Sequence, residues 1–401
     1  MLNKKSNRKL NPANILIFML KEERRSSTLL LIAAVAALYL ANSTWSHDYF
    51  DFFTHTFRLG LVSLSIRHWI NEGLMALFFL VVSLEVKREL IDGELKTWRK
   101  ASFPIFAAIG GMFLPALIFT ALNPYQPQSN GWGIPMATDI AIALGVLALL
   151  GKRVPKSLRV FLLSLAIVDD VGSILIIGLF YNHPSNMFAL FLAAILSFGL
   201  VASRKNKYWP VWFLFLGLGV WYAMLIAGVS ATMAGVIVAF LMPLTTRAKK
   251  VFNLQASEVI EDVLIPVTTF VVVPLFVFAN AGLDLSQISL ASNGGLSVFL
   301  GTSLGLLIGK PLGILCASWI ATKLNLSSKP ANISWSSVAG IGFIAGIGFT
   351  VSLLISDLSY RTQPLLLSSA VFGIFTASIL GAIVGLAILK STLKKVSKAR
   401  A

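Results

Sequence analysis

Residues 157–181 read SLRVFLLSLAIVDDVGSILIIGLFY, an apolar run long enough to cross a membrane that carries two adjacent acids, Asp169 and Asp170, near its middle. Two further charges, Asp139 and Lys310, lie inside comparable runs. An ionised side chain at the centre of a membrane helix costs about 2.5 to 3.5 kcal/mol. Four such residues therefore predict that this part of the chain carries the function.

The composition indicates that these runs are membrane spans. Of the 401 residues, 56% are hydrophobic and 12% are charged, whereas an average soluble domain is about 25% charged. Runs of about 20 apolar residues, the length that crosses a hydrocarbon core, recur along the chain. We predict an all-α polytopic membrane protein with twelve spans, near residues 26–44, 69–91, 101–122, 132–150, 157–181, 186–203, 209–226, 230–244, 257–281, 296–322, 334–357 and 364–389.

The net charge of +16 follows the expected membrane topology rather than a nucleic-acid surface. With the N-terminus in the cytoplasm, all but four of the 33 Lys and Arg residues fall on cytoplasmic segments. The exceptions are Arg58, Arg67 and Arg361 on the opposite side and Lys310 within a span. This positive-inside pattern predicts that both termini are cytoplasmic. Anionic lipid headgroups are the expected neighbours of the cations, and no nucleic acid is expected as a partner.

The chain divides into a cytoplasmic N-terminal segment, residues 1–25, a single transmembrane domain, residues 26–389, and a basic cytoplasmic tail, residues 390–401. We expect the first span to be an uncleaved anchor, because its apolar run is longer than a signal-peptide core and further spans follow. The lone cysteine, Cys316, excludes an internal disulfide and is expected to be a small buried apolar residue.

Residues 45–67 form an external segment between the first two spans. Part of it, FRLGLVSLSI at residues 57–66, alternates partially between apolar and polar side chains. This pattern predicts a short β-hairpin lying on the outer face. The edge of such a hairpin can pair with a second copy of the chain, so a homodimer through the hairpin is a hypothesis.

Two of the predicted spans are interrupted. The fourth reads GWGIPMATDI at residues 131–140, with a proline just before a polar pair, and the eleventh reads GIGFIAGIGFT at residues 340–350, with four glycines in nine residues. The glycines alone fit either close helix packing or local unwinding. Residues 101–181 and 296–389 each place the interrupted span in the middle of three, in opposite orientations. This symmetry favours unwinding and predicts inverted-topology repeats with broken helices, as in many secondary transporters.

The buried charges have signs that suit such breaks. A broken helix presents a positive partial charge where a half-helix begins and a negative one where a half-helix ends. Asp139 and Lys310 would compensate these charges, although a direct part in transport is equally open for both. Asp169 and Asp170 point about 100° apart on one helix, so one cation cannot easily pair with both. One of them can meet Lys310 while the other faces a cavity, and their proximity favours a proton retained in the empty site.

A site of this kind can bind either a proton or a hard monovalent cation. Na+ and Li+ prefer oxygen ligands, which Asp169, Asp170, Thr138, unwound backbone carbonyls and water could supply. If the site is stable only when one of these ions neutralises it, its movement between the two membrane faces exchanges protons for cations. If each cation expels more than one proton, the exchange moves net charge and the membrane potential can drive it.

A series of motifs then identifies a family. In order, they are FFL at 78–80 with LEVKREL at 84–90, ATDIA at 137–141 with ALGVLALLG at 143–151, AIVDD at 166–170, PLF at 274–276 with FANAG at 278–282, GKPLG at 309–313 and GIGFT at 346–350. In this order and spacing, the chain resembles the NhaA family of sodium/proton antiporters from about residue 26 to residue 389.

The resemblance implies exchange of cytoplasmic Na+ or Li+ for external H+ in a bacterial inner membrane, a role in sodium and pH homeostasis, and no cofactor. It assigns cation and proton binding to Asp169 and Asp170 with Thr138 beside them, and charge compensation at the helix breaks to Asp139 and Lys310. Whether Lys310 itself carries a proton stays open.

The family's pH-sensing region would correspond to Glu85, Arg88, Glu89 and Glu261, for which a solvated charged rim is the alternative interpretation. The chain departs from the family in this respect, because Ser230, Asp262 and Ile265 stand where histidines are often found. Histidine is the side chain that ordinarily titrates near neutral pH. The activation pH of the family is therefore not expected to transfer.

Two other classes of membrane protein fit the sequence less well. An intramembrane aspartyl protease takes one acid from each of two helices, commonly after Gly-x-Gly, and neither Asp139 nor Asp170 has that context. A passive cation channel would need a symmetric ring of carbonyls or acids, and neither class explains Lys310 opposite the aspartate pair. No Walker loop, zinc cluster or nucleophile elbow stands in a credible context, so we expect a transporter rather than an enzyme.

Overall fold

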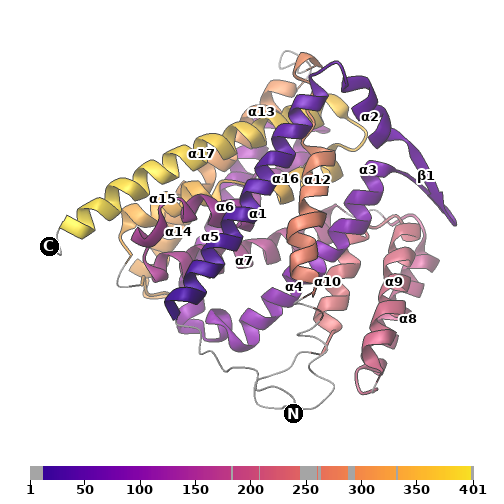
Figure 1. Cartoon of the computed structure of the whole chain (residues 1–401), viewed down its shortest axis with the longest axis horizontal. Helices are drawn as coiled ribbons and strands as arrows, with labels where there is room; N and C mark the ends of the chain where they lie inside the picture. The colour runs from indigo at the N-terminus through magenta and orange to yellow at the C-terminus, as the bar shows by residue number, and fades with distance from the viewer. Residues whose placement is uncertain are drawn as a thin grey trace, which may run out of the picture.

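The computed structural model describes residues 12–181, 184–206, 208–243, 260, 263–287, 294–330 and 333–398. These residues are mostly helical, as the composition predicts (Figure 1). The first third contains α1 Pro12–Ala41, α2 Ser46–Thr54, β1 Thr56–Leu59, β2 Val62–Ser65, α3 Ile66–Trp69, the π-helical turn η1 Ile70–Leu74, α4 Met75–Asp92, the 3₁₀ turn η2 Glu94–Lys96 and α5 Trp98–Leu122.

The middle and last thirds continue the helical pattern. The middle third contains the 3₁₀ helix η3 Gln128–Met136, α6 Ile140–Ala148, the 3₁₀ turn η4 Gly151–Arg153, α7 Lys156–Phe180, α8 Met187–Ser203, α9 Trp209–Ala227 and α10 Thr232–Leu241. The last third contains the π-helical turn η5 Thr268–Val272, α12 Val273–Asn280, η6 Leu285–Gln287, α13 Gly295–Leu304, the π-helical turn η7 Gly305–Gly309, α14 Lys310–Lys323, α15 Trp335–Ala345, α16 Phe349–Tyr360 and α17 Pro364–Lys398.

Several helix ends follow local rules that can be seen in the sequence. The Asn186 side chain accepts a hydrogen bond from Ala189 N at the start of α8, and the Ser334 side chain accepts one from Ser337 N at the start of α15. Both are N-terminal caps that satisfy a free backbone donor. Gly228 ends α9 with a left-handed φ of 73°, which glycine adopts without strain.

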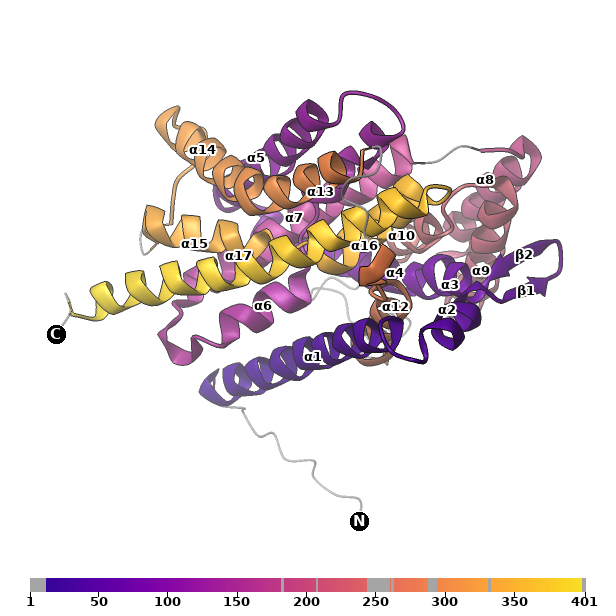
Figure 2. The ribbon, with the colours of Figure 1, turned by 90° about the horizontal axis from the view of Figure 1, so that it is seen from above.

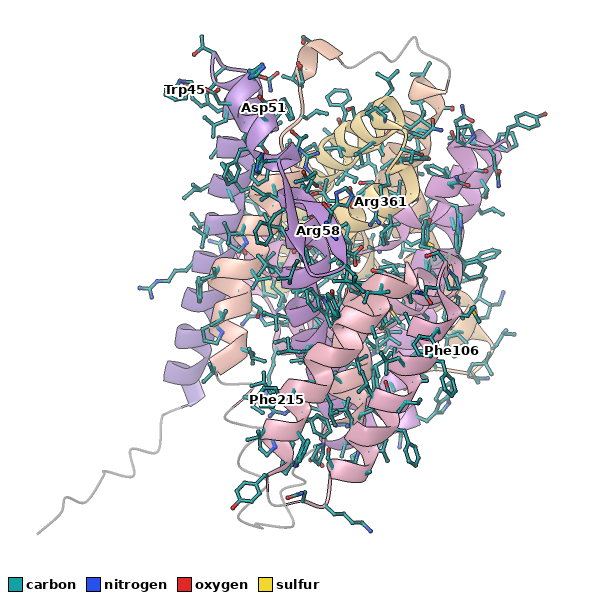
Figure 3. All side chains as sticks on the ribbon, turned by 90° about the vertical axis from the view of Figure 1, so that its right-hand side faces the viewer. Trp45, Asp51, Arg58, Phe106, Phe215 and Arg361 are labelled. Atoms are coloured by element: carbon teal, nitrogen blue, oxygen red, sulfur yellow. The ribbon has the colours of Figure 1, made fainter. Side chains whose placement is uncertain are left out.

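Among the described residues, six helices are long and apolar enough to cross a membrane alone, and nine spans result if each bent helix pair counts as one. α8 and α10 are shorter apolar helices. Large apolar side chains are exposed on the outer faces, including Phe215, which is 65% exposed and stands out from α9 in Figure 3, and Phe113 on α5, which is 66% exposed. An exposed apolar surface of this kind indicates contact with lipid.

The predicted β-hairpin is confirmed. β1 and β2 pair antiparallel with Thr56 opposite Ser65 and Leu59 opposite Val62, and Gly60 occupies the turn with a φ of 60°. All four residues of β1 are exposed. The hairpin is fixed to the helices at its turn, where Leu61 N donates to the Tyr222 hydroxyl of α9 at 3.0 Å.

The helices form two packed groups, and Figure 2 shows α8 and α9 of the smaller group at the right. A large apolar core joins α1, α5, α6, α7 and the helices from α12 to α17, and a smaller one joins α8, α9 and α10 to α4. In Figures 1 and 2, the first turn of α1 and the last turn of α17 both lie toward the left, whereas α2 and the hairpin lie toward the right.

Helices α5 and α14 cross at two glycines. A Cβ added at Gly110 would collide with the carbonyl oxygen of Gly313, and one added at Gly313 would collide with that of Gly110. Small residues let membrane helices approach this closely. The crossing fixes the first turns of α14, and therefore the position of Lys310 at its start.

The expectation that Cys316 is buried is wrong. Its side chain is exposed on the outer face of α14, together with Leu312 and Trp319, which are 46% and 50% exposed. In a membrane the outward face of a helix is as apolar as the core, so hydrophobicity alone does not indicate which side of the helix a residue occupies.

Candidate functional site

The two interrupted stretches meet inside the larger core. η3 and α6 are bent by 44°, and α15 and α16 by 48°, each at a break of at most four residues. Asp139 N donates to Ile347 O at 2.7 Å, and Thr138 Oγ1 donates to Ala345 O at 2.8 Å. Backbone groups freed in one break are thus paired with groups of the other, as an apolar environment requires. A broken span and a re-entrant loop both give this bend.

Asp139 is shared by two helix starts. Its Oδ1 accepts from Ile142 N at 2.9 Å in the first turn of α6, and its Oδ2 accepts from Thr350 N at 3.1 Å in the first turn of α16. Its side chain is almost fully buried. Because each helix start carries a positive partial charge, one carboxylate lies between two positive ends.

Lys310 is the first residue of α14 and contacts the end of η3. It is completely buried, and its Nζ lies 2.5 Å from Asp169 Oδ2. The same Nζ donates to the carbonyl oxygen of Met136, the last residue of η3. Lys310 therefore contacts both a carboxylate and the negative end of a half-helix.

Asp169 and Asp170 have different surroundings, as the helical geometry predicts. Asp169 Oδ2 is contacted by Lys310 and by Thr138 Oγ1, the latter at 2.6 Å. Asp170 points elsewhere, and its Oδ1 has no hydrogen-bond partner among the described residues. Asp169 Oδ1 also lacks a partner within the described part of the chain. Buried oxygens without partners are rare in proteins and mark places where an ion or water can bind.

A third unpaired oxygen lies one helical turn further along α7. Ser173 is buried, and its Oγ has no partner among the residues that the structure describes. Residues three apart lie on the same face of a helix, so Ser173 shares its face with Asp170. Sequence reasoning did not single out Ser173, although a hydroxyl at this spacing was visible.

The predicted charged rim lies on α4. Glu85 and Arg88 are exposed and Glu89 is half-buried, and their spacing puts them on one face of the helix. The fourth member, Glu261, lies outside the described residues, as does Asp262. Ile265 is 44% exposed.

A neighbouring lysine has a role that the sequence did not reveal. Lys87 Nζ donates to Phe240 O at 2.8 Å and to Met242 O at 2.5 Å, at the carboxyl end of α10. Arg204 Nε donates to Leu241 O at 2.6 Å in the same turn. Two cations therefore neutralise the negative end of this helix.

A second buried charge cluster, which sequence reasoning missed, lies near the hairpin end. Glu72 of η1 and Asp357 of α16 are both almost fully buried. Glu72 Oε1 accepts from Arg361 at 3.0 Å, and its Oε2 accepts from Ala231 N at 2.7 Å. Asn71 donates to Asp357 Oδ2 at 3.0 Å. The cluster joins η1, the start of α10 and the end of α16.

Ser230, at a position where the family often has histidine, belongs to this second cluster. Its Oγ lies 2.7 Å from Thr232 Oγ1 and 3.4 Å from Glu72 Oε2. Both acids of the cluster stand inside predicted spans. The signal that identified Asp139 would therefore also have identified Glu72 and Asp357.

Replacing Arg361 by Ala is expected to lower the thermal unfolding midpoint in detergent. The change leaves a buried Glu72 oxygen without its cation, and an unsatisfied buried group costs about 1 to 3 kcal/mol. The Arg361 side chain is 41% exposed, so the lower end of that range applies. Arg58→Ala is the matched control, because Arg58 Nε donates to Gly60 O within its own turn. Equal unfolding midpoints for the two variants would contradict a stabilising role of the contact between Arg361 and Glu72.

Long apolar helices, an outer surface of exposed apolar side chains and a buried cluster of opposite charges define an integral membrane protein with a charged centre. Comparison with known proteins identifies the family. The family described as Na+/H+ antiporter 1 matches residues 18–389. The chain therefore belongs to the NhaA family of Na+/H+ antiporters, which are transporters and not enzymes.

Relatives in several bacteria cover nearly the whole chain. The chain is 44% identical to the Na+/H+ antiporter NhaA of Vibrio parahaemolyticus over 370 residues, which cover 90% of this chain and 94% of the relative. It is 45% identical to NhaA of Shewanella pealeana over 360 residues, covering 88% and 91%. It is 43% identical to NhaA 1 of Klebsiella pneumoniae over 370 residues, covering 89% and 91%.

Proposed function

We propose that the chain exchanges cytoplasmic Na+ for external H+ across a bacterial inner membrane and so contributes to sodium and pH homeostasis. Membership of the NhaA family supports sodium/proton exchange. The observation that best supports an ion-binding site is the pair Asp169 and Asp170. Each is buried, and each has one oxygen that lacks a partner among the described residues. Lys310 compensates only one of these two buried negative groups, so the other requires a proton or a cation.

In the proposed cycle, protons and the cation compete for Asp169 and Asp170. Thr138, the free backbone carbonyls and water complete the shell of a bound Na+ or Li+. Lys310 holds Asp169 when the cation is absent, and Asp139 stabilises the two helix starts throughout. Na+, Li+ and H+ are cargo in this proposal, and it includes no resident cofactor. If each cation displaces more than one proton, the exchange is electrogenic, and the proton gradient and the membrane potential drive it.

The architecture that we propose for this function has twelve spans, with inverted repeats over residues 101–181 and 296–389. The crossing of the two bent pairs supports it, because inverted-repeat transporters place their ion sites between such helices. The proposal puts both termini in the cytoplasm, on the basis of the positive-inside pattern. The first turn of α1 and the last turn of α17 lie toward the same side of the molecule, which is compatible with this topology (Figure 2).

The charged rim of Glu85, Arg88, Glu89 and Glu261 is proposed to modulate the exchange by pH. Its position on α4 supports this proposal: α4 packs against α7, the helix that carries the aspartate pair, and three of the four residues share one face of α4. Asp262 and Ile265 stand in the sequence where this region often has histidines. The pH of activation should therefore depend on carboxylates rather than on imidazole groups.

A homodimer through the hairpin is also proposed. β1 is exposed along its whole length, and Figure 3 shows Arg58 in front of the helices. An exposed strand edge is a template for pairing with another chain.

Replacing Phe57 and Leu59 together by Asp is expected to convert a dimer in detergent into a monomer, as measured by light scattering, because like charges at the strand edge repel each other. Leu285→Asp, at another exposed apolar position, should remain dimeric, and an unchanged mass in the double variant would contradict the proposal.

Proteoliposomes containing a pH-sensitive dye test the exchange itself. Addition of Na+ or Li+ outside the vesicles should alkalinise the lumen, because protons leave as the cation enters. Imposing a membrane potential should change the rate if the exchange is electrogenic. A channel would instead dissipate the gradient without a fixed ratio of protons to cations.

The apparent affinity for Na+ is expected to rise with pH. A single competing proton changes the apparent affinity by up to about tenfold per pH unit over the range in which it is bound, because ligand groups must lose their protons to bind a metal ion. Measuring the half-saturating Na+ concentration between about pH 6 and 9 checks this expectation. A flat dependence would argue against a site shared by protons and Na+.

A further inference from the structure

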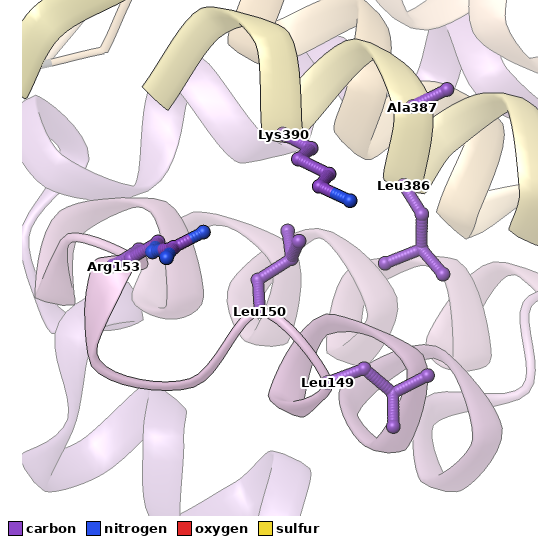
Figure 4. Close-up of a pocket in the computed structure, with 6 residues that line it drawn as sticks. All are labelled: Leu149, Leu150, Arg153, Leu386, Ala387 and Lys390. Atoms are coloured by element: carbon purple, nitrogen blue, oxygen red, sulfur yellow. The ribbon is translucent and has the colours of Figure 1, made fainter. Parts of the chain in front are cut away.

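An open hollow lies where the link between α6 and α7 approaches α17. It has a volume of about 750 Å³ and is lined by Leu149, Leu150, Arg153, Leu386, Ala387 and Lys390. Figure 4 shows Arg153 to the left of Leu150 and Lys390 above it. The hollow therefore has a cationic rim above an apolar floor.

The two cations face no compensating acid in the described part of the chain. No carboxylate lines the hollow, and no ion pair links Arg153 or Lys390 to another described residue. Both side chains are exposed. The rim therefore favours an anionic group, and an arginine guanidinium can contact a phosphate with two parallel hydrogen bonds.

An apolar stripe leads away from the rim along α17. Leu386, Ile383 and Ile379 follow Lys390 at helical spacing, and Ile383 and Ile379 are 59% and 58% exposed. At the helical rise of 1.5 Å per residue, Lys390 and Ile379 are roughly 16 Å apart along the axis. This is about half of the hydrocarbon thickness of a bilayer, which is roughly 30 Å. One leaflet's acyl chain would fit along the stripe with its phosphate at the rim.

We propose that this hollow binds an anionic phospholipid of the leaflet in which Lys390 lies. Arg153 and Lys390 contact its phosphate, and one acyl chain lies against Leu386, Ile383 and Ile379. A soluble anion would not use the stripe. A zwitterionic lipid would bring a second cation toward the rim. The lipid would bridge the link after α6 and the end of α17, two segments far apart in sequence that belong to the two proposed repeats.

Native mass spectrometry of the delipidated full-length chain tests the site, with phosphatidylglycerol and phosphatidylcholine of identical acyl chains as probes. The wild type should retain phosphatidylglycerol in preference to phosphatidylcholine. Arg153→Ala with Lys390→Ala should weaken phosphatidylglycerol binding about 30-fold, the effect of two basic groups near a lipid surface. Arg99→Ala with Lys323→Ala removes the same charge from two exposed cations that do not line the hollow, and it should bind as the wild type does.

Several outcomes would overturn the proposal. Equal binding of the two lipids would show an apolar groove without headgroup selection, and equal loss in both double variants would show a net-charge effect. Full competition by inorganic phosphate would identify a site for a free anion. Ile383→Ser should weaken lipid binding while leaving the rim intact. An unchanged affinity for phosphatidylglycerol would exclude the apolar stripe from the lipid site. The proposal rests on the membrane location of the chain but not on exchange, so proteoliposome assays of the same variants separate its failure from failure of the transport site.

Discussion

Replacing Asp170 by Asn is expected to abolish Na+-dependent proton movement in proteoliposomes while leaving a folded protein. Asn keeps the size of the side chain but can neither release a proton nor supply a negative charge to a cation. Asp170 is almost fully buried and Oδ1 has no partner among the described residues. Loss of its charge should therefore disturb few contacts, and the unfolding midpoint should stay close to that of the wild type or rise.

Asp169→Asn should also abolish the exchange, but with a structural effect that Asp170→Asn lacks, because Lys310 loses its carboxylate partner. Asp48→Asn, at an exposed acid in the first turn of α2, is the control and should transport normally. Exchange at the wild-type rate in Asp170→Asn would exclude Asp170 from the site. Loss of folding in Asp170→Asn would show a structural role instead.

Replacing Lys310 by Met is expected to destabilise the fold more than Arg361→Ala or Asp170→Asn does. Met retains most of the apolar stem but removes the cation, which leaves Asp169 as a charge in a completely buried position. Breaking a buried ion pair in this way costs about 3 to 5 kcal/mol. The thermal unfolding midpoint of the purified protein should therefore fall well below that of Lys323→Met, a change at an exposed lysine on the same helix.

A second variant separates charge from packing. Lys310→Met combined with Asp169→Asn removes both charges, so most of the lost stability should return if the cost arises from an uncompensated carboxylate. Acidification should likewise reduce the deficit of Lys310→Met, since a protonated Asp169 needs no cation. A deficit that persists in the double variant and at acid pH would attribute the effect of Lys310 to packing or to its contact with Met136 O.

The helical class and the burial of four charges could be predicted from the sequence because a membrane imposes strong rules. Apolar runs must satisfy their own backbone groups and charges within them are costly, so Asp139, Asp169, Asp170 and Lys310 were conspicuous. That only one of Asp169 and Asp170 would meet Lys310 followed from the 100° step of a helix. The hairpin followed from the local alternation of apolar and polar side chains.

What the sequence did not reveal depends on contacts between distant segments. The pairing of Glu72 with Arg361 joins residues 289 positions apart, and Arg361 alone was indistinguishable from a solvated loop cation. Lys87 lay in a charged motif, yet it contacts the carboxyl end of α10. Cys316 was placed on the wrong side of its helix because lipid and protein core select the same apolar residues. Glu72 and Asp357 were overlooked although the cost of burying charge applies to them equally.

The same contrast applies to Asp139. Its sign suited a helix start, but only the three-dimensional arrangement shows one carboxylate accepting from the first turns of both α6 and α16. A sequence can indicate which charges are buried. It cannot specify which two of several helix ends share one of them, because that depends on how the bent pairs cross.

Proton release on cation binding is the most direct measure of competition between protons and Na+ at the aspartate pair. The purified protein in weakly buffered detergent solution, near neutral pH, receives NaCl or, as a control for ionic strength, choline chloride, while a dye reports the pH. We expect Na+ to acidify the medium by at least one proton for each cation bound, choline to have no effect, and Asp170→Asn to release none. Binding of Na+ by the wild type without any acidification would contradict competition between protons and cations at the aspartate pair.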